Sequence, residues 1–172
     1  MYLSISDLKL TRIDSRAKGA IFVGTEMYGN HRPSSYVVVD GGKEVSGKLA
    51  LGLSGKGAFL AIRLGQGSKL LGIELPHADL VMLEVGDQKT SPFNGSLDVG
   101  QLLVTTRGAY LGIDWSSVSK EFAVVDLKTW TLHSYMDVNA DDGKALLVNW
   151  RLVHRHQDQT FVLAEAVEAK PA

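Results

Sequence analysis

Short runs of Val, Leu, Ile, Phe and Tyr recur along the whole chain, and glycine-rich turns separate them. The runs begin roughly every 10 to 14 residues, which is the spacing of an all-β protein. Turn makers such as Gly41-Gly42, Asn94-Gly95 and Asp142-Gly143 stand between them. We expect strands near 2–11, 20–25, 35–40, 45–53, 58–64, 69–75, 80–85, 101–106, 109–114, 121–127, 130–137, 145–153 and 159–167. The sequence therefore predicts an all-β, antiparallel fold, with room for a short helix only near 96–103 or at the C-terminus.

The stretch 145–153 has the clearest alternation of apolar and polar residues. Leu146, Val148, Trp150 and Leu152 fall on one face, because successive side chains of a strand point to opposite sides of the sheet. We expect one continuous strand here, with Trp150 in the core.

Several segments of the first half resemble segments of the second half in the same order. SYVVVD (35–40) matches EFAVVD (121–126), and GKGAFLAIRL (55–64) matches GKALLVNWRL (143–152). KGAIFVG (18–24) likewise matches RGAYLGI, and KLLGIEL matches TFVLAEA. Self-similarity at a nearly constant period indicates an internal duplication. We interpret the chain as two similar β units, 1–87 and 91–172, which form one compact pseudo-twofold domain.

Two arrangements of these units remain open. Two units of about six to seven strands each could pack as a sandwich-like or barrel-like pair, and a small β-propeller is the alternative. The hairpin FAVVDLKTWTLHSY (122–135) resembles the outer hairpin of a propeller blade. It has Trp130 at the place where a glycine usually follows such a turn.

Composition excludes several functional classes. The 172 residues include 18 Lys and Arg against 19 Asp and Glu, so no net charge favours nucleic acid or an anionic membrane. The chain has no cysteine, no membrane-spanning apolar run and no secretory signal, so we expect a cytoplasmic protein. GKEVSGKL (42–49) lacks the hydroxyl of a phosphate-binding loop, because Leu49 occupies that place. We therefore expect no cofactor.

His154 and His156 form a His-x-His pair, the pattern by which a strand presents two imidazoles to one metal ion. In the duplication, however, the residues after Leu152 correspond to the turn GQGSK that follows Leu64. We therefore place both histidines in a hairpin turn and predict no metal site, although a histidine loop in a metal-dependent hydrolase remains an alternative.

YLGIDWSSVSKEFAVVD (110–126) has two strands that each end in aspartate, Asp114 and Asp126. This pattern resembles the first hairpin of actin-like ATPases and of RNase H-like nucleases, and in the nucleases Asp114 would help to hold a metal ion. Both families then require helices on a mixed sheet, whereas the following residues read as strands. A metal- or nucleotide-dependent hydrolase that uses Asp114 and Asp126 is thus an alternative function.

Two polar connections occupy corresponding places in the predicted units, GTEMYGNHRPS (24–34) and IDWSSVSK (113–120). Because β scaffolds present function on loops, and Tyr, Trp and Arg are enriched at interface hot spots, we list the aromatic and basic residues here as candidate binding residues. These are Tyr28, His31, Arg32 and Trp115, together with Trp130 in the hairpin turn.

The function that these observations favour is a non-enzymatic, protein-binding module. A toxin-neutralising immunity protein, another inhibitor or an assembly subunit would have this near-neutral profile without a cofactor motif. A carbohydrate-binding duplicate is a further alternative, because aromatic and Asn/Asp-rich residues gather at the turns.

Overall fold

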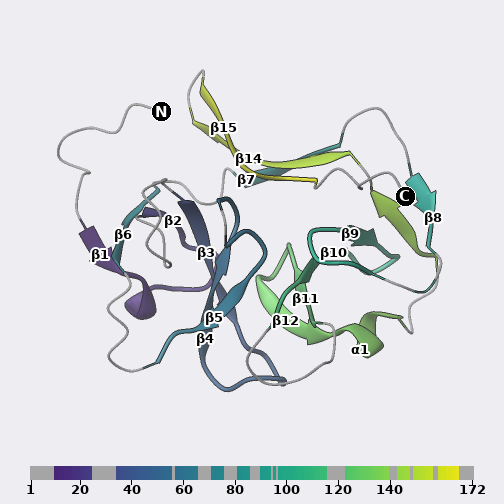
Figure 1. Ribbon diagram of the computed structural model, residues 1–172, viewed down its shortest axis with the longest axis horizontal. Coiled ribbons are helices and arrows are strands. Elements are labelled where there is room, and N and C mark those ends of the chain that lie inside the picture. Colours follow the sequence, from purple (N-terminus) through teal and green to yellow (C-terminus); the bar gives the residue numbers. More distant parts are fainter. Residues whose placement is uncertain are drawn as a thin grey trace.

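Figure 1 presents the computed structural model of the chain. It describes residues 10–24, 34–55, 57–65, 71–75, 81–85, 90–93, 95, 97–115, 123–139, 143–147, 149–156 and 159–166. Nearly all of the regular secondary structure in these residues is β-strand, which confirms the predicted all-β class. The elements are β1 (Leu10–Arg12), η2 (Ile13–Ser15), β2 (Ile21–Gly24), β3 (Ser34–Asp40), β4 (Lys48–Gly52), β5 (Ala61–Arg63), β6 (Leu71–Glu74), β7 (Val81–Val85), β8 (Thr90–Pro92), β9 (Leu102–Val104), β10 (Ala109–Ile113), β11 (Ala123–Asp126), β12 (Thr131–Ser134), α1 (Tyr135–Asn139), β13 (Ala145–Leu147), β14 (Trp150–His156) and β15 (Gln159–Glu165).

The strands form a large sheet and a small one. The large sheet has the order β1-β6-β2-β3-β12-β11-β10-β9-β13-β8, and β4 and β5 branch from β3. The small sheet has the order β15-β14-β7 and lies across one side of the large sheet, at the top of Figure 1. Among the described strands, all pairings are antiparallel except that of β3 with β12. Neither sheet closes on itself in the described part of the chain.

Strand β3 joins the two halves of the chain. On one side it pairs with β4 along Tyr36–Asp40, and on the other side with β2 up to Val37. Past the last β2 pair, β12 pairs with the same edge of β3, where Thr131 lies opposite Asp40. The backbone N–H of Asp40 donates to the carbonyl oxygen of Trp130 over 2.9 Å. A second contact, the parallel bridge between Leu60 and Asp114, also connects the halves.

The main hydrophobic core lies between the two sheets. It combines β3 and β4 of the large sheet with Trp150, Leu152 and Leu163 of the small sheet. Trp150 is only 2% exposed, so its prediction as a core residue is confirmed. Successive residues of a strand point to opposite faces of the sheet. Val125 therefore packs in this core, whereas Val124 packs in a second cluster beside α1.

The predicted single strand over 145–153 is wrong. The chain forms β13 and β14 instead, with a bend at Asn149, and these strands belong to different sheets. Leu146 therefore packs in the cluster beside α1, while Trp150 and Leu152 pack in the main core. Periodicity alone missed the break, because the alternation continues through the point where the chain changes sheets.

The predicted turn at His154 and His156 is also wrong. Strand β14 continues through both residues, and β15 begins at Gln159. His154 is 2% exposed and lies between Val81 of β7 and Phe161 of β15 in the sheet register. The internal alignment matched these histidines to the turn after Leu64. This match was wrong because β14 is seven residues long, whereas its counterpart β5 has only three. The side chain of His156 lies outside the described residues.

The two predicted units have only partly matching pairings. The β2–β3 pair and the β10–β11 pair occupy corresponding places in the alignment, and both are antiparallel hairpins. Strands β14 and β15 pair with each other, whereas their counterparts β5 and β6 pair with other strands. The duplication stays a prediction. No helix in the described ranges is long and apolar enough to cross a membrane.

Candidate binding pocket

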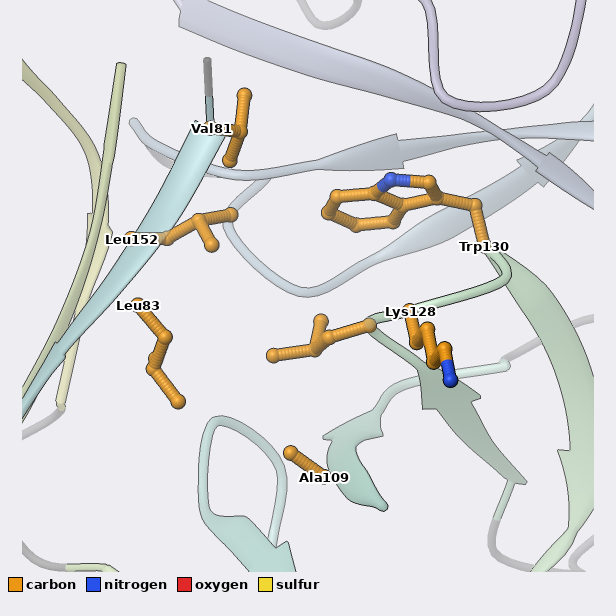
Figure 2. A pocket seen from close by; sticks show the side chains of 7 residues that line it. Val81, Leu83, Ala109, Lys128, Trp130 and Leu152 are labelled. Carbon is orange, nitrogen blue, oxygen red and sulfur yellow. The ribbon is translucent and has the colours of Figure 1, made fainter. Parts of the chain in front are cut away.

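A cavity of about 390 Å³ opens between the small sheet and the β11–β12 hairpin. Figure 2 shows its lining side chains, which come from four separate parts of the chain. They are Val81 and Leu83 of β7, Ala109 of β10, Leu127, Lys128 and Trp130 of the hairpin turn, and Leu152 of β14. Six of these seven residues have apolar side chains, whereas backbone groups, the Lys128 amine and the Trp130 N–H supply more than half of the exposed lining.

The aspartate at the end of β11 shapes the hairpin that forms one wall. One carboxylate oxygen of Asp126 accepts the backbone N–H of Lys128 over 2.7 Å and that of Thr129 over 3.3 Å. Its other oxygen accepts the hydroxyl of Thr129 over 3.0 Å. Aspartate commonly stabilises turns in this way. Asp126 is therefore committed to holding the turn that presents Leu127 and Lys128 to the pocket.

Trp130 closes this turn with a left-handed backbone conformation, φ 50°. A side chain with a Cβ disfavours this region by roughly 1–2 kcal/mol, so glycine is the usual residue there. Two hydrogen bonds fix the backbone of Trp130: its N–H donates to the carbonyl of Asp126 over 2.8 Å, and its carbonyl accepts from Asp40. In Figure 2 the indole extends across the pocket toward Val81 and Leu152.

The opposite wall comes from the inward face of the small sheet. Leu83 of β7 lies opposite Leu152 of β14 in the register, so the two side chains point to the same face. Met82, between Val81 and Leu83, points to the other face and is 44% exposed. The alternation of β7 thus supplies the pocket with two aliphatic side chains and leaves Met82 outside it.

Lys128 is the polar side chain of the lining. It is exposed, and the described part of the chain offers no ion-pair or hydrogen-bond partner to its ammonium group. The nearest carboxylate along the chain, Asp126, already accepts three hydrogen bonds within the turn.

A second hollow of about 470 Å³ lies beside β15, against the turn that contains Leu53, Ser54 and Phe59. A chain of hydroxyl groups crosses between the sheets at this place. Ser35 Oγ donates to the carbonyl of Leu163 over 3.1 Å, and the hydroxyl groups of Ser35 and Ser54 lie 2.9 Å apart. Because the proton of Ser35 is used by Leu163, Ser54 must donate to Ser35. These hydroxyl groups are satisfied within the fold and act as a clamp between the sheets.

The structure separates the two carboxylates that the sequence suggested for metal-dependent chemistry. Asp126 lies opposite Tyr110, at one end of the β10–β11 hairpin. Asp114 follows the other end of β10, four residues along the strand, so the Cα atoms are on the order of 13 Å apart. Within the described ranges, no group of three or more His, Asp or Glu side chains could hold a metal ion.

The predicted binding residues have different surroundings. Tyr28, His31 and Arg32 lie outside the described residues. Trp115 is 7% exposed and packs in the main core, whereas Trp130 is half-buried and lines the pocket.

Sequence reasoning missed the other residues of the pocket. Leu127 and Lys128 lie in the same hairpin turn as Trp130, so the sequence pattern could have predicted that they lie close to it. The sequence pattern could not have predicted Val81, Leu83 and Leu152, because their position at the pocket depends on how the small sheet packs on the large one.

Comparison of the chain with protein-family models, curated proteins and solved structures gave no match.

Proposed function

We propose that the chain is a non-enzymatic binding module and that its pocket receives a large apolar side chain of a partner protein. The observation that carries this proposal is the half-buried indole of Trp130, which forms one wall of a cavity of about 390 Å³ whose other lining side chains, apart from Lys128, are aliphatic. Interface hot spots are enriched in tryptophan and cluster in pockets from which water is displaced. An inhibitor of a toxin or a subunit of an assembly would both use such an anchor.

The strained backbone of Trp130 supports this proposal. Left-handed non-glycine residues persist only where the surroundings hold them, and they are frequent at binding sites. Here the carboxylate of Asp126 and the backbone of Asp40 hold the backbone of the turn, and Gly19 lies against the indole, so the ring has few positions available before a partner arrives. A fixed indole loses little side-chain entropy on association, which favours its use as an anchor.

The side chains of the lining favour an apolar side chain of a protein over the alternatives. Sites for sugars and other small polar ligands need several convergent polar groups to fix the ligand, and this pocket has one amine among its side chains. A hydrolase that pairs Asp114 with Asp126 would need them at one place, whereas they lie at opposite ends of a hairpin. An apolar side chain would pack against the aliphatic side chains of β7 and β14.

Blocked tripeptides of the form acetyl-Ala-X-Ala-amide test this proposal. With X as Phe or Leu, NMR titration of the isotopically labelled protein should shift the amide signals of Leu83, Ala109 and Leu152. With X as Ser, these signals should not move. Binding of all three peptides with the same affinity, or of none, would overturn the proposal.

Two variants locate the binding. Ala109→Leu fills the cavity from β10 and should abolish the shifts that the Phe peptide causes. Met82→Ala is the matched control, because Met82 lies on the other face of the same strand that supplies Leu83. It should leave the affinity unchanged. Equal affinities for both variants would place the peptide elsewhere on the protein.

A further inference from the structure

We propose that the partner carries an acidic residue directly beside its apolar anchor, and that Lys128 pairs with this carboxylate at the edge of the pocket. This inference rests on the proposed function above, because it names the chemistry of the same partner. It comes from the charges around the pocket, whereas the proposed function comes from its apolar walls.

The basic side chains elsewhere in the described ranges are mostly occupied. Arg16 Nε lies 3.0 Å from Glu74, Arg151 lies 3.6 Å from Glu165, and Arg155 pairs with Glu84. Lys48 and Lys144 donate to backbone carbonyl groups. Lys18 and Lys43 are exposed and show no partner among the described residues either, so what distinguishes Lys128 is that it lines a pocket.

Among the described residues, the carboxylates next to the hairpin form no ion pair with this ammonium. Asp126 holds the turn with both of its oxygens. Asp40, which adjoins Trp130 through its backbone, accepts the N–H of Gly42 over 2.9 Å. An incoming carboxylate finds an ammonium without an ion-pair partner among the described residues, and the nearby charges of Asp126 and Asp40 weaken the attraction.

The position of Lys128 determines what kind of anion fits. Leu127 and Trp130 face the apolar space, and Lys128 lies between them in the chain and is exposed. A partner that fills the cavity with one side chain would bring the residue beside that side chain to Lys128. The flexible stem of lysine allows its ammonium to follow a carboxylate of Asp or Glu over a range of positions. Complementary charge of this kind selects partners more than it adds affinity.

Four blocked tetrapeptides test the inference: acetyl-Ala-Phe-Asp-Ala-amide and acetyl-Ala-Asp-Phe-Ala-amide, each with an Asn isostere. The NMR shifts above report the affinity, and so does intrinsic fluorescence, to which Trp115 and Trp150 contribute beside Trp130. At least one Asp peptide should bind about threefold to tenfold more tightly than its Asn isostere, and 0.5 M salt should reduce this preference. Lys128→Gln should abolish the preference, and Lys128→Glu should reverse it.

The outcomes separate the inference from the proposed function. If the Phe peptides bind but neither Asp peptide binds more tightly than its Asn isostere, the inference of an acidic residue is wrong and the proposed apolar anchor is supported. If no Phe peptide binds, both are wrong. The free acid 3-phenylpropionate distinguishes the source of the carboxylate, because it should bind more weakly than the better Asp peptide. Tighter binding of the free acid would assign the site to a small molecule and overturn the acidic residue of a protein partner.

Discussion

Trp130 combines a strained backbone with a side chain at the pocket. Its φ of 50° is a conformation that glycine adopts without penalty. The indole also contacts the neighbouring turn, since a Cβ added at Gly19 would lie 3.0 Å from Trp130 Cδ1. The residue therefore costs free energy in its backbone and contributes contacts through its ring. A substitution that keeps the backbone strain and removes the ring contacts separates these two effects.

Replacing Trp130 by Gly and by Ala makes this separation. Both variants lose the indole, so both should be less stable than the wild type and should not bind the Phe peptide. Trp130→Gly should be more stable than Trp130→Ala by about 1 kcal/mol, because only glycine adopts the left-handed region without strain. Urea unfolding measures the difference. A more stable Ala variant would show that the hydrogen bonds of Asp126 and Asp40 do not enforce the conformation.

Close contact with a neighbouring turn constrains strand β10 at Gly112. A Cβ added to Gly112 would stand 2.4 Å from the carbonyl oxygen of Asp98, because the Asp98–Gln101 turn lies against the strand. Two hydrogen bonds hold it there, from Gly100 N–H to the Gly112 carbonyl over 2.8 Å and from Gly112 N–H to Gln101 over 2.9 Å. The glycine is needed for the approach of two backbones.

Gly112→Ala should therefore destabilise the protein by about 3 kcal/mol, since the turn must move away from β10. Gly57→Ala is the matched control, because a Cβ there meets nothing within 4 Å. It should change the stability by less than about 0.5 kcal/mol. Thermal and urea unfolding of both variants provide the measurement. Similar losses of stability in the two variants would contradict the close-packing argument.

The sequence predicted most strands, because β-branched and aromatic runs between glycine turns depend on local chemistry. It did not predict β8, whose three residues Thr90–Pro92 are too few to form a pattern. It predicted a strand over 130–137, whereas β12 ends at Ser134 and α1 follows. A helix of five residues is too short for a 3.6-residue stripe. The hydroxyl of Ser134 accepts the N–H of Met136 and thereby supports the start of this helix.

The candidate pocket was predictable only in part, for a physical reason. Trp130 could be singled out because it occupies a glycine position in a hairpin, which is a local signal. Leu83 and Leu152 reach the same cavity only after β7 pairs with β14 and the small sheet packs on the large one. These contacts join residues far apart in sequence, and no local pattern encodes them.

At the scale of the whole molecule, the core crosses the boundary between the two predicted units, 1–87 and 91–172. The main cluster includes Val37 and Leu51 of the first unit together with Val125 and Trp150 of the second. Strand β7 belongs to the first unit, yet within the described residues it pairs only with β14 of the second. The two units are therefore expected to depend on each other for folding, as the halves of one domain do.

Expression of 1–87 and 91–172 as separate fragments tests this dependence. Each fragment alone would expose its share of the core, and the first would leave β7 without a partner, so neither should show a cooperative unfolding transition. Mixed in equal amounts, the fragments should associate and recover the transition together with the near-ultraviolet signal of buried Trp150. Association should fail for a 91–172 fragment that carries Leu152→Asp, because this change places a charge between the sheets. Cooperative transitions of 1–87 and of 91–172, each alone, would instead mean that each unit is an independent domain, and the pocket between β7 and the hairpin would then be an interface between domains.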